Sequence, residues 1–338
     1  MLVSSLYCGR PSTQEVVSDY SQRVHKVASR HNHRPYQSSL TPYPRRRDIK
    51  LPETVGNISF VKFLSLDQCG LKKLIAERNS VLGKQMLNSQ RLLYEHKLSL
   101  TLETCINEQR NAKSTDKHFI KKLIEIKEAK ATDLDIAYWN GTFASKEIHN
   151  HFSFSSGPLD INQHLNSQSQ LEALRFLNDL SLKLGKFDSI ISEEMEGHYQ
   201  ALSERHYGGE LLQAMDLLAF HLYATANALN ETTHANNFCS DGKTREKAKV
   251  LKNIFEKFYV VKIQPYLSRV HKESSIWLTM MGKMVGQHHT QSEILLNYYK
   301  KQLDPKQNTS AIARLTSANT DHINAWKKLF EKCNISIY

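Results

Sequence analysis

The chain of 338 residues carries 45 Lys and Arg against 34 Asp and Glu, giving a formal net charge of +11, and 40% of it is hydrophobic. That apolar content is enough for a buried core, but no apolar run approaches the roughly 20 residues that a membrane-spanning helix needs. With 13 glycines and 8 prolines, five of the prolines within the first 52 residues, the chain lacks the turn formers of a β-rich fold. We therefore expect a soluble, all-α protein.

Residues 1–57 combine proline, serine, histidine and arginine without a sustained apolar period. Such a segment buries too little apolar surface to offset the entropy lost on ordering, so we predict a mostly disordered arm with a short helix near residues 16–28. The arm carries nine Lys and Arg against four acids, and Arg45, Arg46 and Arg47 form a basic tract that could contact an anionic surface. A solvated linker is the simpler explanation of so short a charge run.

Residues 58–136 are predicted to form a long αα-hairpin. Its first helix carries apolar residues at steps of four and seven: Ile75, Leu82, Met86, Leu93 and Leu100. A second apolar stripe, starting at Phe119, can fold back on the first. Lys117, Lys121 and Lys122 near the turn are candidates for a basic tip, although solvated lysines are ordinary at such a helix end.

Residues 169–338 are predicted to form a C-terminal bundle of several helices, joined to the hairpin by an aromatic, Gly- and Pro-containing connection over residues 137–168. Five segments between residues 169 and 303 repeat an apolar stripe at helical spacing, and the most apolar of them is expected to be the central helix. Pro265 should break the run around it, because proline lacks the backbone N–H and clashes with the preceding turn. Six side chains are predicted to be buried: Leu174, Leu177, Leu218, Leu222, Phe255 and Met284.

Histidine and carboxylate residues on the bundle helices are the best candidates for chemistry. Glu194 and His198 are one helical turn apart, and Glu231 and His234 have the Glu-x-x-His spacing of helical di-iron sites. With His221 and His288 they form a candidate ligand set for iron, manganese or zinc. Di-iron sites repeat the Glu-x-x-His motif, however, and this chain has one copy, so buried histidines with hydrogen-bond partners are the simpler explanation.

The five cysteines are far apart, odd in number and in no C-x-x-C pair, which argues against a disulfide framework or a zinc finger. The first residues also lack the pattern of a secretory signal. We therefore expect a cytoplasmic location or another reducing compartment.

No nucleophile elbow, P-loop or dinucleotide-binding motif occurs in the sequence. The favoured function is a non-enzymatic helical scaffold or adaptor that binds a protein partner and needs no cofactor. In this hypothesis the basic arm adds weak contacts to nucleic acid or acidic lipid. The alternative is a helical-bundle metalloenzyme with a His/Glu site.

Overall fold

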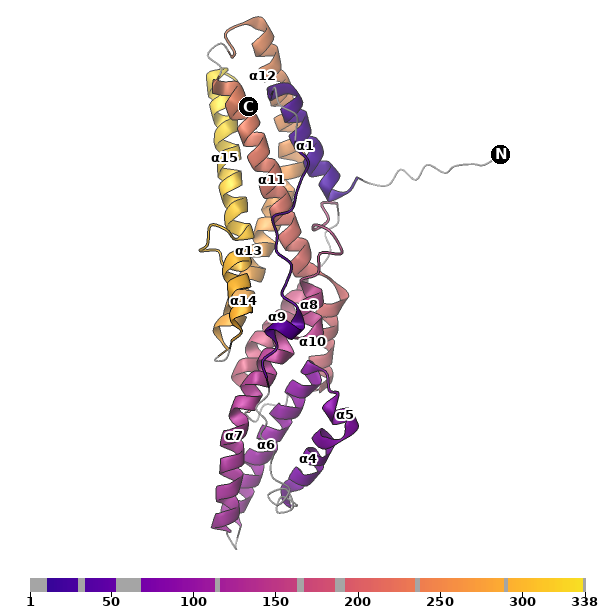
Figure 1. The fold of residues 1–338 in the computed structure, drawn as a ribbon. Coiled ribbons are helices and arrows are strands. Elements are labelled where there is room, and N and C mark those ends of the chain that lie inside the picture. The colour runs from indigo at the N-terminus through magenta and orange to yellow at the C-terminus, as the bar shows by residue number, and fades with distance from the viewer. Residues whose placement is uncertain are drawn as a thin grey trace, which may run out of the picture.

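The computed structural model describes residues 11–29, 34–52, 68–112, 116–162, 167–185, 192–234, 238–288 and 291–336. All regular secondary structure in these ranges is helical, and none of their residues lies in a strand. The predicted all-α class is confirmed. The molecule is elongated, with a long helical bundle at one end and a helical hairpin at the other (Figure 1). None of the described helices combines the length and the apolar character needed to span a bilayer.

The bundle is built around α11 (Tyr207–His234), which packs against α1 (Thr13–Ala28), α13 (Gln264–Gly286) and α15 (Ala311–Lys332). Most of its side chains are buried, which agrees with the central position predicted for the most apolar stripe. Shorter helices complete this part of the chain: α8 (Lys146–His151), α9 (Gln168–Lys183), α10 (Ser192–Glu204), α14 (Glu293–Tyr298) and the π-helical turn η3 (Tyr299–Leu303).

Most of the predicted core is confirmed. Five of the six side chains are buried: Leu174, Leu177, Leu218, Leu222 and Met284. Phe255 is only partly buried, because its ring lies at the edge of the core, stacked on Tyr259 and tilted against Trp326.

The hairpin consists of α6 (Asn88–Asn111) and α7 (Lys117–Thr142), which pack along each other. Three short elements precede it: η1 (Gln68–Gly70), α4 (Leu71–Asn79) and α5 (Val81–Lys84). Residues of η1, α4, α6 and α7 share an apolar cluster, distinct from the core of the bundle. Because α7 continues to Thr142, Tyr138 and Trp139 are helical and buried instead of lying in a connection.

The N-terminal segment is more ordered than its composition indicates. Helix α1 begins with a capping box, in which Ser12 accepts a hydrogen bond from the N–H of Glu15 and Glu15 accepts one from the N–H of Ser12. Val17, Tyr20 and Val24 fall on one face of α1 and are at most 1% exposed in the core. The short helix predicted near residues 16–28 is confirmed, with Thr13 as its first residue. Tertiary packing on α11 supplies the burial that the local composition lacks, so the prediction of a mostly disordered arm is wrong for the described part of this segment.

A second part of the predicted arm also lies against the bundle. Residues 34–45, which we call the strap, are extended and lead into the short helix α2 (Arg46–Ile49). The Tyr43 hydroxyl donates to the carbonyl of Phe143 (2.9 Å), and Ile49 is 1% exposed. Residues 1–10, 30–33 and 53–57 of the arm lie outside the described residues.

Pro265 does not break its helix. The chain continues without interruption from α12 (Gly242–Ile254) through the π-helical segment η2 (Phe255–Ile263) into α13. Pro265 occupies the first turn of α13, directly after η2. Because η2 already replaces the regular i to i−4 hydrogen bonds by i to i−5 bonds, the missing N–H of the proline does not end the run.

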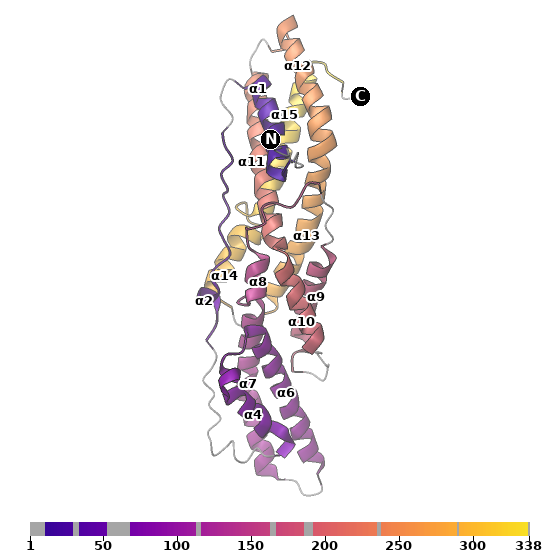
Figure 2. The ribbon, with the colours of Figure 1, turned by 90° about the vertical axis from the view of Figure 1, so that its right-hand side faces the viewer.

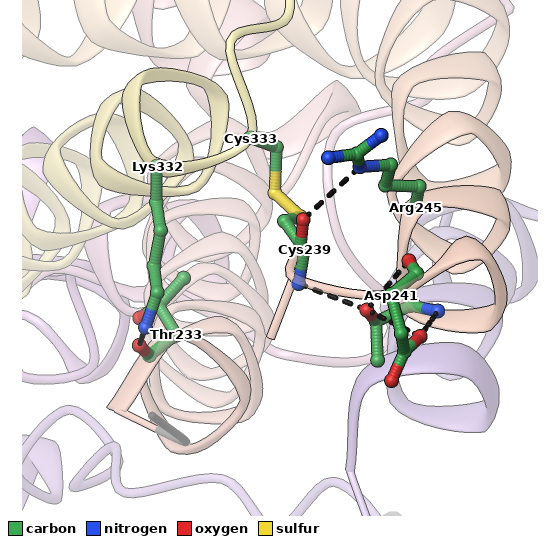
Figure 3. The surroundings of a disulfide bond; sticks show 7 residues. Thr233, Cys239, Asp241, Arg245, Lys332 and Cys333 are labelled. Carbon is green, nitrogen blue, oxygen red and sulfur yellow. Dashed lines mark hydrogen bonds between the residues drawn. A yellow bond between two sulfur atoms is a disulfide. The ribbon is translucent and has the colours of Figure 1, made fainter. Parts of the chain in front are cut away.

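Four of the five cysteines form two disulfides, so the predictions of unpaired cysteines and of a reducing compartment are wrong. Cys69 pairs with Cys105, and Cys239 with Cys333, at Cα–Cα distances of 5.5 and 5.3 Å. The second bond ties the segment before α12 to the end of α15 (Figure 3). Such bonds persist in oxidising surroundings, so the pairing indicates an extracellular or periplasmic type of environment.

Candidate functional site

The three arginines at the start of α2 form ion pairs or hydrogen bonds with nearby residues. The side chains of Arg45 and Arg47 lie 2.7 and 3.6 Å from carboxylate oxygens of Asp48. Arg46 donates through Nε to the carbonyl of Ala144 (3.0 Å). Asp48 therefore offsets part of the charge of the tract, and Arg46 is hydrogen-bonded to the backbone after α7. The three arginines do not form a free basic arm.

The lysines of the predicted basic tip lie at the start of α7. Lys117 and Lys121 are exposed, and Lys122 is half-buried. This end of α7 is the far tip of the hairpin, whereas α2 lies beside α14 in the middle of the molecule (Figure 2). The two basic clusters predicted from the sequence therefore do not join into one surface.

The candidate metal ligands are not brought together. Three of them lie against different aromatic rings: His198 stacks on Phe176, His221 lies beside Tyr36, and His288 stacks on Tyr138. Glu194, Glu231 and His234 are exposed, and Glu231 accepts a hydrogen bond from Ser29. The described part of the chain contains no group of three or more His, Cys, Asp or Glu side chains that could hold a metal ion.

Asp216 of α11 is the anchor of the strap. Its carboxylate is 3% exposed and accepts hydrogen bonds from the hydroxyls of Tyr36 (2.7 Å), Ser38 (3.0 Å) and Ser39 (2.6 Å). Arg314 of α15 pairs with it at 2.7 Å. Burial alone would raise the pKa of Asp216, but the hydrogen bonds from Ser39, Tyr36 and Arg314 outweigh it and hold the pKa below its usual value.

Replacing Asp216 with Asn should therefore destabilise the fold, by roughly 3 kcal/mol, because the charge of Arg314 loses its partner and the donors of the strap lose acceptors. Since the folded-state pKa is lowered, the stabilisation is present above about pH 4 and is lost as the pH falls further. Urea unfolding at pH 7 and at about pH 3.5 measures both effects. Asp321→Asn, at an exposed position of α15, is the control. Its free energies of unfolding at the two pH values should equal those of the natural chain.

A second feature is a groove between the start of α6, α8 and α10, with a volume of about 380 Å³. We call it the acidic groove and define it by Leu87, Leu93, Glu147, Met195, Glu196 and Tyr199. Its volume falls at the lower end of the range for sites that bind small molecules. Its lining contains two carboxylates and no Lys, Arg or His.

The apolar part of the acidic groove is well fixed on one side and open on the other. Met195 and Tyr199 are 3% and 5% exposed, and the Tyr199 hydroxyl donates to the carbonyl of Gly141 in α7 (2.5 Å). Leu87 is 51% exposed and occupies the N-cap of α6, where Ser, Thr, Asp or Asn would stabilise the helix by about 1 kcal/mol. An exposed leucine at this position does not stabilise the isolated fold.

The carboxylates lie beside this apolar surface. Glu147 of α8 is half-buried and Glu196 of α10 is exposed, and neither makes a hydrogen bond or ion pair with another side chain in the described ranges. Residues 192–204 contain four glutamates and no Lys or Arg, in a chain of net charge +11. The groove therefore combines aliphatic contact with a local negative charge. That acidic run was the signal in the sequence that could have pointed to it.

Comparison with known proteins identifies a family. A family model described as "Protein of unknown function (DUF3080)" matches residues 17–337, so the chain belongs to that family. No curated protein and no solved structure matches the chain.

Proposed function

We propose that this member of the DUF3080 family is a non-enzymatic helical adaptor that binds a protein partner in an oxidising compartment through the acidic groove. The observation that carries the proposal is the exposed Leu87 beside Glu147 and Glu196, two carboxylates that no other described side chain pairs. Interfaces concentrate their binding energy in a few apolar anchors placed in pockets and bordered by polar groups. The groove has this composition.

The charge of the groove selects the kind of partner. Carboxylates repel phosphate groups, so this surface disfavours nucleic acid and acidic lipid and favours a Lys or Arg side chain of another protein. A partner segment with an aliphatic side chain next to a basic one would bury the first against Leu87 and Met195 and pair the second with Glu147 or Glu196. Charge-assisted hydrogen bonds of this kind are stronger than neutral ones.

The helices that line the acidic groove are connected to one another by hydrogen bonds. Tyr199 connects α10 to α7, and Asn150 of α8 donates through Nδ2 to the carbonyl of Ser203 in α10 (2.6 Å). Sites held between helices lose little conformational freedom when a partner binds. The metal-based alternative has no such supporting observation, because its six candidate residues lie apart.

Site-specific photo-crosslinking tests the proposal in the cells that naturally make the protein. A photoreactive phenylalanine analogue at Gln200 or Ser203, both in the lining of the groove, should yield one defined cross-linked protein. The same analogue at Asn253, an exposed position of α12, should not yield that product. A charge reversal, Glu147→Lys with Glu196→Lys, should abolish the product because the basic side chain of the partner is then repelled.

Leu87→Ser separates binding from folding. Serine is a favoured N-cap residue, so this variant should be as stable as the natural chain or slightly more stable, by up to about 1 kcal/mol, while the cross-linked product is lost. Retention of the product in both the charge-reversed and the Leu87→Ser chains would show that the groove is not the binding site. Equal cross-linking from Asn253 would show that the contact is not specific.

A further inference from the structure

A second surface, on the outer side of the helix that runs from α12 through η2, carries exposed lysines together with exposed valines. Seven Lys and Arg and two Glu occur between Gly242 and Ile263, an excess of five positive charges. Three valines project from the same stretch, with exposed fractions of 45%, 40% and 66% for Val250, Val260 and Val261. Val260 and Val261 are adjacent in the chain, and Val250 lies about three helical turns before them.

The two glutamates of this stretch neutralise only two of its seven cationic side chains. Glu246 pairs with Lys249 (2.6 Å) and Glu256 with Lys252 (3.5 Å). The remaining cations are Lys243, Arg245, Lys247, Lys257 and Lys262, all of them exposed. The guanidinium of Arg23 in α1, which is paired with Asp19 (2.8 Å), lies 4.2 Å from the centre of the Phe258 ring, and the Lys262 ammonium lies 5.4 Å from the same centre.

The π-helical segment contributes three residues to this surface. In η2, Val260, Val261 and Lys262 are consecutive and exposed. π-Helical turns are rare and occur frequently at functional sites. The helix runs along one edge of the upper bundle (Figure 2), so its outer stripe can meet a flat surface over its whole length.

We propose that the outer face of α12 and η2, which we call the basic face, docks onto an anionic lipid surface. Helices that lie in a membrane interface combine lysines, which attract anionic headgroups, with apolar side chains that enter the headgroup boundary. Val250, Val260 and Val261 have the second role and Lys243, Lys247 and Lys257 the first. Nucleic acid would use the lysines but leaves the valines without contacts, and the disulfides indicate surroundings in which nucleic acid is not the usual partner. The basic face is separate from the acidic groove, so this inference does not depend on the proposed protein partner.

Co-sedimentation of the full chain with vesicles tests this inference. The natural chain should bind vesicles of phosphatidylcholine with phosphatidylglycerol, and not vesicles of phosphatidylcholine alone. Replacing Lys243, Lys247 and Lys257 with Gln should weaken binding by roughly 100-fold, since each lysine near an anionic surface contributes about fivefold. The matched control carries the same loss of charge on α5 and the hairpin, as Lys84→Gln, Lys117→Gln and Lys121→Gln, and should bind like the natural chain.

The valines are tested separately. Val250→Ser with Val261→Ser should weaken vesicle binding severalfold and leave its dependence on salt unchanged, because apolar contacts are not screened. Any of three results would overturn the inference: no binding of the natural chain to anionic vesicles, equal weakening by the basic-face and hairpin variants, or tighter binding to a single-stranded oligonucleotide that the valine variants do not affect.

Discussion

Lowering the pH from 8 to 5 should reduce the free energy of unfolding by roughly 4 kcal/mol, because two buried histidines stay neutral in the folded protein and become charged when it unfolds. His151 is fully buried, and burial together with the nearby Arg205 and His206 lowers its pKa to about 3. His322 is equally buried, and burial lowers its pKa to about 3 as well. The stabilisation is complete above the unfolded-state pKa of about 6.5 and is lost progressively between about pH 6.5 and pH 3.

The contacts of both rings explain why the neutral form is needed. Nε2 of His151 accepts a hydrogen bond from Nε1 of Trp277 (3.0 Å). Nε2 of His322 lies 2.6 Å from the Tyr20 hydroxyl and 3.1 Å from Nε1 of Trp326. A proton on either Nε2 would remove the acceptor and place a charge in the core, which is costly without a paired anion.

Urea unfolding at pH 8 and pH 5 measures this effect, and His322→Gln should remove about half of the difference between the two values. The side-chain oxygen of glutamine can still accept a hydrogen bond, but the side chain does not titrate. His118→Gln, at an exposed position of α7, is the control and should keep the full difference. An unchanged difference in the His322→Gln variant would contradict this assignment.

The helices that the sequence predicted well are those with a long apolar stripe. In α11, buried residues such as Met215, Leu218 and Leu222 recur at steps of three and four, so local spacing alone identifies the core face. In α1 the stripe is only three residues long, and its partners lie some 200 to 300 residues away, as the pairing of Tyr20 with His322 shows. Local composition cannot report contacts of that range, so it indicates a short helix near residues 16–28 but not that this helix is packed into the core.

The errors about chemistry have the same origin. A histidine on an apolar stripe has the same local pattern whether it binds a metal or stacks on an aromatic ring, and His288 shows the second case against Tyr138. Disulfides likewise need no local motif, since Cys239 and Cys333 are separated by 94 residues and meet only in the folded bundle. The acidic groove joins the ends of three helices, so the glutamates of α10 were visible in the sequence but their apolar neighbours were not.

Replacing Cys239 and Cys333 together with serine should lower the free energy of unfolding by roughly 5 kcal/mol, because the bond closes a long loop and restricts the unfolded chain. The sequence separation is 94 residues, compared with 36 for Cys69 and Cys105, whose removal should cost roughly 4 kcal/mol. Local contacts of Cys239 would survive the replacement. Its N–H donates to Thr244 Oγ1 (3.0 Å). Its carbonyl accepts from Arg245 Nε (3.2 Å), as Figure 3 shows.

Urea unfolding of the natural and substituted chains measures the loss, and addition of a reductant supplies the control. Reductant should destabilise the natural chain, and it should have no effect on a chain that lacks both pairs. Thiol titration of the denatured, unreduced protein checks the pairing itself. Four of the five cysteines are paired, so one thiol per chain should react before reduction and five after it. Five reactive thiols before reduction, in protein isolated without reductant, would contradict both disulfides and the oxidising environment that they indicate.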